Sequence, residues 1–407
     1  MDAKISRELD WLEAAIDEFA ETSIRGGEYW RASYTDEDRA AVEMLTGWYT
    51  ERGFKVYTDE VGNLYGRLEG KESGVILTGS HRDTVKHDGK YGGALGLLSA
   101  VAAVTGLNQE LGQPVKTVEI VATVEEEGSR FISSYTGSRA IAGKLKPEHL
   151  EEEDAQGITL KQAMEDAGYY KGSLPEPRKD IERFVELSAE QGSVMEKSLK
   201  KVGLVQSIVG LEVGSITIHG EQNHAGTTPM SMRKDPVPYA AEIIASLTKW
   251  ANSRNDRVVV TFGNIQVQPG KPNIIADSVT ITFDIRSTNE SLLSEARSIL
   301  QEFRNSAGPG FSVDYKIAAY DAPADMDLDG ILAMRDIAAE HNMKYMRIDS
   351  GAGHDAQIVA DCFPTNMIFV PSEKGIAHSP LEYTSREDLE EGYILLREYL
   401  RTLAWGK

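Results

Sequence analysis

The sequence contains a single cysteine, Cys362, among its 407 residues. One cysteine forms no intrachain disulfide and no thiolate cluster for a metal ion. The sequence therefore excludes a disulfide framework and a cysteine-type zinc site, and it fits a protein of the reducing cytoplasm.

Positive charge and long apolar runs are also scarce. The chain has 43 Lys and Arg against 64 Asp and Glu, a formal net charge of -21 that repels phosphate backbones and anionic lipids. No stretch approaches the roughly 18 apolar residues of a membrane span, and the N-terminus lacks the basic start and apolar core of a signal peptide. We therefore expect a cytoplasmic protein with neither nucleic acid nor membrane as a partner.

The chain is long enough for two hydrophobic cores, at 407 residues and 41% hydrophobic content. Residues 75–124 predict strand, helix and strand, with short apolar strands of the kind buried in a parallel sheet. Residues 213–320 predict the β-α-β-β-α-β order of a ferredoxin-like sandwich, and helices alternate with short strands again after 321. We predict an α/β domain with a mixed, mostly parallel sheet flanked by helices at 1–210 and 326–407, interrupted by a ferredoxin-like α+β domain at 211–325.

Two segments at the ends of predicted strands carry candidate catalytic residues. His81 lies in GSHRDT, and Asp83 shares its face of an extended chain, so Asp83 could orient the imidazole. The glutamates at 125–127 follow an apolar strand, where burial would raise their pKa unless a cation were near. One could bind a metal ion while its neighbour acts as a general base. A core histidine and an acidic surface turn are the alternatives.

The predicted inserted domain carries three further candidates. His224 lies in the Gly-Pro loop HAGTTPM and could donate a hydrogen bond to a developing oxyanion. Asn273 in GKPNIIAD and Arg286 at the end of TITFDIR could bind an amide or a carboxylate. An arginine at a strand end is more often an ordinary ion-pair partner on the surface.

Eight segments, taken in order, resemble the successive motifs of one family across nearly the whole chain: GSHRDTV, EEEGSRF, AEQG, NHAGTTPM, PNIIAD, FDIR, SGAGHDA and AHSPLEYT. The family is that of the zinc-dependent aminoacylases and carboxypeptidases, peptidase family M20. The resemblance is to its branch of N-carbamoyl-L-amino-acid hydrolases, β-ureidopropionases and allantoate or ureidoglycolate amidohydrolases. It implies a zinc-exopeptidase-like catalytic domain with two metal ions, and an inserted domain that forms a homodimer and closes over the site.

The resemblance also implies a role for each matching residue. Glu126 is the general base, Asp83 lies behind the metal site, and His224 polarises the scissile carbonyl. Asn273 and Arg286 bind the substrate carboxylate, and Gln191 and His354 line the pocket. The expected metal ligands are His81, Glu127 and His378.

Two positions depart from the family pattern. Gly92 stands where the family has an aspartate that bridges both metals, and Ser188 stands where it has a metal-binding histidine. Glycine supplies no ligand and serine is a poor one for zinc, so we expect at most one ion, Zn or Mn, and possible loss of metal altogether. His87 or Asp88 could compensate by turning inward, and Arg82 could occupy the space of a cation if it pointed into the site.

The sequence therefore predicts an enzyme that hydrolyses a C–N bond of an N-carbamoyl or N-acyl amino acid or of a ureide, with a reduced metal site. Two alternatives are a non-catalytic ligand-binding homologue and a metal-independent enzyme acting on a related carboxylated substrate.

Overall fold

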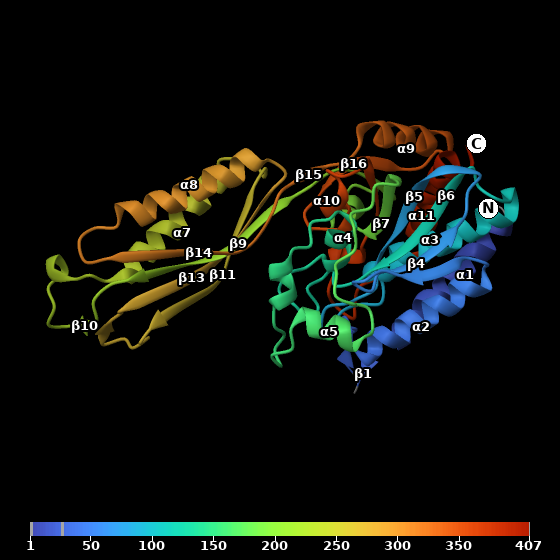
Figure 1. The fold of residues 1–407 in the computed structure, drawn as a ribbon. Helices are drawn as coiled ribbons and strands as arrows, with labels where there is room; N and C mark the ends of the chain where they lie inside the picture. Colours follow the sequence, from blue (N-terminus) through green and yellow to red (C-terminus); the bar gives the residue numbers. More distant parts are fainter. Residues whose placement is uncertain (1–2, 26–27, 407) are drawn as a thin grey trace. The chain divides into compact units, whose positions relative to one another are not determined.

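The computed structural model describes residues 3–25 and 28–406, which form two compact units (Figure 1). Unit 1 comprises Met1–Gln206 and Asp325–Lys407, and unit 2 comprises Ser207–Ala324. Unit 2 is thus inserted into the chain of unit 1.

A nine-stranded sheet lies at the centre of unit 1. Its order is β15, β8, β17, β7, β5, β6, β4 and β3, with β16 paired to β8. β5 runs parallel to β6 and β7, and β17 runs parallel to β7, whereas β3, β4 and β8 pair antiparallel. The strands are β3 (Lys55–Thr58), β4 (Leu64–Leu68), β5 (Glu72–His81), β6 (Lys116–Thr123), β7 (Ile181–Ala189), β8 (Val202–Ile208), β15 (Ala324–Asp325), β16 (Tyr345–Ser350) and β17 (Thr365–Val370).

Helices flank this sheet, as the sequence predicted. The longer helices are α1 (Ala3–Glu21), α2 (Asp36–Glu51), α3 (Gly92–Leu111), α9 (Leu328–Glu340) and α11 (Arg386–Leu400). Shorter elements are β1 (Ile24–Arg25), β2 (Glu28–Tyr29), α4 (Thr136–Ile141), η1 (Pro147–Glu151), α5 (Leu160–Asp166), α6 (Val194–Lys197), α10 (Asp355–Val359), η3 (Glu373–Gly375) and η4 (Arg401–Trp405).

Helix α3 packs closely on β5, β6 and β7 and also contacts α1 and α11. Glycines permit this approach, because a Cβ at Gly93 would lie 2.1 Å from the carbonyl oxygen of His81, and one at Gly96 would lie 2.0 Å from that of Leu187. Among the described residues, α3 is the one helix long and apolar enough to cross a membrane. Judged by length and composition alone, the expectation that the chain has no such stretch was therefore wrong. Its apolar window is 72% buried against the rest of the chain, as is common for a core helix.

Unit 2 has the element order β9 (Gly210–His219), α7 (Pro236–Asn252), β11 (Val259–Gln268), β13 (Ser278–Ser287), α8 (Glu290–Ser306) and β14 (Ser312–Asp321). The four strands form an antiparallel sheet in the order β11, β13, β9, β14. Alternate residues of β9 and β13 are buried, and this face packs against α7 and α8. β10 (Asn223–His224), η2 (Met230–Met232) and β12 (Ile274–Ile275) complete the unit.

Candidate active site

The register of the central strands places the candidate residues of unit 1 at one edge of the sheet. His81 ends β5 and pairs with Thr123, so the glutamates at 125–127 follow just beyond it. Thr78 is level with Val185 on the other side, which puts His81 level with Ser188 three residues later. The carboxyl ends of parallel strands meet at this edge, where open α/β sheets commonly place their ligands.

His81 presents its Nε2 atom to the two glutamates. Its Nδ1 atom lies 2.9 Å from the carbonyl oxygen of Asp83, and a carbonyl can only accept, so Nδ1 carries the proton. In the neutral ring Nε2 therefore offers a lone pair, and this atom lies 3.8 Å from Oε2 of Glu126 and 4.0 Å from Oε1 of Glu127. The ring is held as in many metal-binding histidines, although a backbone carbonyl holds it here instead of the expected carboxylate.

The Asp83 carboxylate fixes the two glutamates. Its oxygens accept hydrogen bonds from the backbone N–H of Glu126, at 3.0 Å, and of Glu127, at 3.2 Å. Glu125 has a structural role, because its buried carboxylate accepts from the backbone N–H groups of Arg130 and Phe131. The three consecutive glutamates are thus divided between one that closes the loop and two that face His81.

Glu127 lies between the two histidines. Its Oε1 is 3.4 Å from Nε2 of His378 and 4.0 Å from Nε2 of His81. The contact with Glu127 is the main reason that the pKa of His378 is raised to about 9. Burial favours a higher pKa for Glu127, but the hydrogen bond from His378 and the charge of His81 hold it below its usual value. Burial likewise favours a lower pKa for His81, yet Glu127 and other carboxylates raise it.

Glu126 is set apart by its electrostatics. Burial, followed by repulsion from Glu127 and Asp355, raises its pKa well above the ordinary value. A carboxyl with a raised pKa can take up and return a proton near neutral pH, as a general base requires.

Sequence reasoning missed two buried acids behind this group, Glu186 and Asp355. Glu186 accepts hydrogen bonds from Ser80 Oγ at 3.0 Å and from the Ala356 N–H at 2.9 Å, and Asp355 accepts from Thr123 Oγ1. Burial and the charge of Asp355 raise the pKa of Glu186 to about 8. A sequence signal was present: Glu186 shares the strand face of Ser188, two residues away.

The donor groups fit a divalent cation. Ligand atoms of His81, Glu126 and Glu127 all lie within 4.8 Å of one another. Imidazole nitrogen and carboxylate oxygen are ligands that zinc and manganese accept, and a cation would offset the repulsion among these buried acids. Gly92 offers no ligand atom, and the Ser188 hydroxyl donates to the carbonyl of Ala189 at 3.3 Å.

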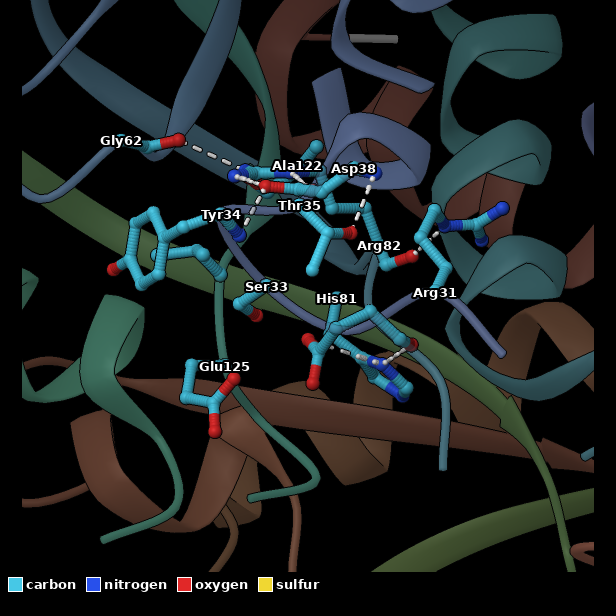
Figure 2. A network of polar contacts seen from close by, with 12 residues as sticks. Arg31, Ser33, Tyr34, Thr35, Asp38, Gly62, His81, Arg82, Ala122 and Glu125 are labelled. Atoms are coloured by element: carbon cyan, nitrogen blue, oxygen red, sulfur yellow. Dashed lines mark hydrogen bonds and ion pairs between the residues drawn. The ribbon is translucent and has the colours of Figure 1, made fainter. Parts of the chain in front are cut away.

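Arg82 points away from the site, contrary to the possibility that it replaces a cation there (Figure 2). Its guanidinium binds both carboxylate oxygens of Asp38, at 2.6 and 3.2 Å, and donates to the carbonyls of Gly62 and Ala122. Successive side chains of an extended segment face opposite sides, so Arg82 lies opposite His81 and Asp83. Arg31 donates to the carbonyl of Arg82 and anchors the same strand end.

His354 and Gln191 have different surroundings. His354 is buried, with Nε2 3.0 Å from Ser350 Oγ and its ring edge-on to Phe369. Burial, and then the charge of His81, lower its pKa to about 3, so the ring is neutral at physiological pH. Gln191 has a positive φ of 57° just beyond the end of β7, and its N–H donates to Ser372 Oγ.

The three candidates in unit 2 fall into two places. His224 and Asn273 are neighbours, because Ala225 donates to the carbonyl of Asn273 and β10 pairs with β12. Arg286 is near the other end of β13, where both oxygens of Asp284 accept from its guanidinium at 2.9 Å. The eight residue steps from Ser278 to Arg286 span about 26 Å of strand.

The ring of His224 has a defined tautomer. Its Nδ1 accepts from the backbone N–H groups of Gly226, at 3.0 Å, and Thr227, at 3.2 Å. A neutral ring whose Nδ1 accepts carries its proton on Nε2. Because the residue is exposed, its Nε2–H is available to an oxygen acceptor.

Comparisons with known proteins identify the family of this chain. Residues 77–402 match the model of peptidase family M20/M25/M40. The chain is 39% identical to the allantoate amidohydrolase of Escherichia coli (strain K12), covering 87% of this chain and 88% of the relative. It is 35% identical to the N-carbamoyl-L-amino acid amidohydrolase of Geobacillus stearothermophilus, covering 93% and 94%.

Solved structures give the same result. An amidase of the hydantoinase/carbamoylase family from Burkholderia multivorans has a TM-score of 0.87 and 28% identity, covering 96% of this chain and 97% of that one. With the family model matched over most of its length, the chain belongs to peptidase family M20/M25/M40, and the relatives it resembles are amidohydrolases.

Proposed function

We propose that this protein is a cytoplasmic enzyme that hydrolyses a C–N bond of an N-carbamoyl or N-acyl amino acid or of a ureide. The observation that carries the proposal is the grouping of His81, Glu126 and Glu127, whose ligand atoms lie within 4.8 Å of one another. Within this group, the buried carboxyl of Glu126 has a raised pKa. The names of the amidohydrolase relatives support the reaction class.

His81, Glu127 and His378 would hold a divalent cation, Zn or Mn, with at most one ion per chain because Gly92 and Ser188 supply no suitable ligand. A cation at this place supplies Lewis-acid chemistry that polarises the scissile carbonyl.

Glu126 acts as the proton carrier. Its carboxylate takes a proton from the attacking water as the C–O bond forms, and returns it to the departing nitrogen as the C–N bond breaks. Asp83 keeps Glu126 in place through the backbone hydrogen bond at 3.0 Å. The raised pKa makes the Glu126 carboxylate a stronger base for the first of these transfers.

We assign substrate contacts to unit 2. The Nε2–H of His224 is suited to donate to the oxyanion that develops on the carbonyl, and Asn273 lies beside it. Arg286 would bind the substrate carboxylate, and to do so its guanidinium would have to release the carboxylate of Asp284. His354 and Gln191 would line the pocket in unit 1.

A homodimer would reconcile these roles. About 26 Å of strand separates the two groups within one unit 2, more than an amino-acid-sized substrate spans, so two chains would have to supply them. Mixing the weakly active His224→Ala and Arg286→Ala variants should then restore part of the activity, and light scattering should give twice the chain mass of 44.7 kDa. A monomer, or a mixture with no regained activity, would remove the dimer from the proposal.

The main experiment compares Glu126→Gln with Glu127→Gln. N-carbamoyl-L-amino acids, N-acetyl amino acids and allantoate are offered to the manganese- or zinc-loaded protein, and product amine and ammonia are measured. We expect Glu126→Gln to lower kcat by about 10²–10⁴ with metal content unchanged. Glu127→Gln should lower metal content itself. Full turnover by Glu126→Gln would refute the mechanism.

The missing ligands at Gly92 and Ser188 favour one rival, a homologue that binds ligand without catalysis. That rival predicts saturable binding of the same compounds and no product from any of them. A metal-independent enzyme would instead retain turnover after exhaustive chelation.

A further inference from the structure

The loop between β5 and α3 contains a buried carboxylate that the proposed function leaves unused. Asp88 is 1% exposed. Its Oδ1 accepts from the N–H of Gly89 at 2.8 Å, whereas its Oδ2 has no hydrogen-bond partner among the described residues. A buried carboxylate oxygen without a partner is unusual, because burial costs it the hydrogen bonds of water.

This oxygen faces the place where a side chain is missing. A Cβ built at Gly92 would have one atom within 4 Å, Oδ2 of Asp88, at 3.7 Å. Gly92 is the position at which the family pattern expects a metal-binding aspartate. The Asp88 carboxylate therefore lies within van der Waals contact of the Cβ position of such a side chain.

Asp88 also belongs electrostatically to the active-site group. The charges that act on it include those of Glu127, His378 and His81. Glu382 is a further neighbour, but its Oε2 already accepts from the N–H of Gly92 at 3.3 Å. Asp88 is thus the acidic neighbour of Gly92 that has a carboxylate oxygen without a hydrogen-bond partner among the described residues.

We propose that Asp88 replaces the aspartate missing at Gly92, and that it adds a carboxylate to His81, Glu127 and His378 around the single divalent cation of the proposed function. Two carboxylates and two imidazoles form a ligand set that zinc and manganese accept. The proposal deepens the proposed function and rests on its metal requirement. The second metal position of the family pattern still lacks its histidine, because Ser188 stands in that place, so the proposal keeps the chain at one ion.

His87 provides a matched control in the same loop. It is exposed, with a positive φ of 63°, and its backbone N–H donates to the carbonyl of Tyr29. A histidine is a stronger zinc ligand than most side chains, yet this one faces solvent, so His87→Asn should leave metal binding unchanged.

The test measures Mn²⁺ binding to the full-length, chelator-stripped protein by electron paramagnetic resonance of the free ion, with calorimetry for Zn²⁺. We expect one ion per chain for the unmodified protein and for His87→Asn, and at least a tenfold weaker affinity for Asp88→Asn. The double variant Gly92→Asp/Asp88→Asn should recover the affinity, which also shows that the loop still folds.

Two results would overturn the inference in distinguishable ways. If Asp88→Asn binds the ion as tightly as the unmodified protein, Asp88 is not a ligand, and the proposed function stands. If the unmodified protein binds neither Mn²⁺ nor Zn²⁺ while the double variant does, the metal requirement of the proposed function fails with it.

Discussion

The buried ion pair between Arg82 and Asp38 leads to a quantitative prediction about stability. Arg82→Met removes the guanidinium and leaves the Asp38 carboxylate, which is 1% exposed, without its cation. Breaking a buried pair on one side costs about 3–5 kcal/mol, because the remaining charge stays buried and uncompensated. We expect the free energy of unfolding of unit 1 to fall by about 4 kcal/mol.

Urea denaturation of the metal-free protein measures this change. Trp11 and Trp48, whose ring centroids lie 5.7 Å apart between α1 and α2, report on unit 1 by fluorescence. With a denaturant slope of about 3 kcal/mol per molar urea, the midpoint should fall by roughly 1.3 M. Arg39→Met is the control: Arg39 pairs with Asp36 on α2 with side chains 69% and 79% exposed, so the change should stay within about 0.5 kcal/mol.

A double-mutant cycle separates the pair from its surroundings. Arg82→Met/Asp38→Leu removes both charges, and replacing an entire buried pair by apolar groups is often nearly neutral. The double variant should therefore be more stable than Arg82→Met alone. Equal stability of Arg82→Met and Arg39→Met would refute the reasoning. So would a double variant whose loss of stability equals the sum of the losses in Arg82→Met and Asp38→Leu.

Three further predictions follow from the site. In metal-free protein the pKa of Glu186 is raised to about 8 and that of His378 to about 9, so the folded state is favoured while they are protonated. Thermal stability should fall as pH rises from about 4.5 to 9, and a melting temperature that climbs over this range would contradict the shifts. Gly92→Asp combined with Ser188→His should raise bound zinc from one ion to two per chain by elemental analysis; an unchanged count would show that these positions do not face the site. His224→Ala should lower kcat by about 10²–10³ with little effect on metal content, because it removes an oxyanion donor; an unchanged kcat would exclude that role.

The sequence predicted the parts of the fold that local pattern determines. The short apolar strands and the helix between them appear as β5, α3 and β6, and the parallel pairing of β5 with β6 follows from that order. The grouping of His81 with Glu126 and Glu127 was also predictable, because both segments end neighbouring strands.

Contacts between distant or competing groups were harder to predict. Asp83 offers either its carbonyl or its carboxylate to His81, and only the backbone conformation decides that the carbonyl is used. The direction of Arg82, which the sequence left open, agrees with strand alternation, but its partner Asp38 lies 44 residues earlier. The pairing of Arg286 with Asp284 was open to prediction, since residues two apart on a strand share a face.

The glycine contacts of α3 also set limits for directed evolution. Any side chain at Gly93 or Gly96 would collide with backbone carbonyls rather than with movable groups, so saturation libraries at these positions should yield mostly misfolded clones. In the loop at 84–91, by contrast, the side chains of Lys86 and His87 are exposed to solvent. Substitutions aimed at new substrates should therefore be made at Lys86, His87 and the exposed residues around His224. Gly93 and Gly96 at the start of α3 should be kept.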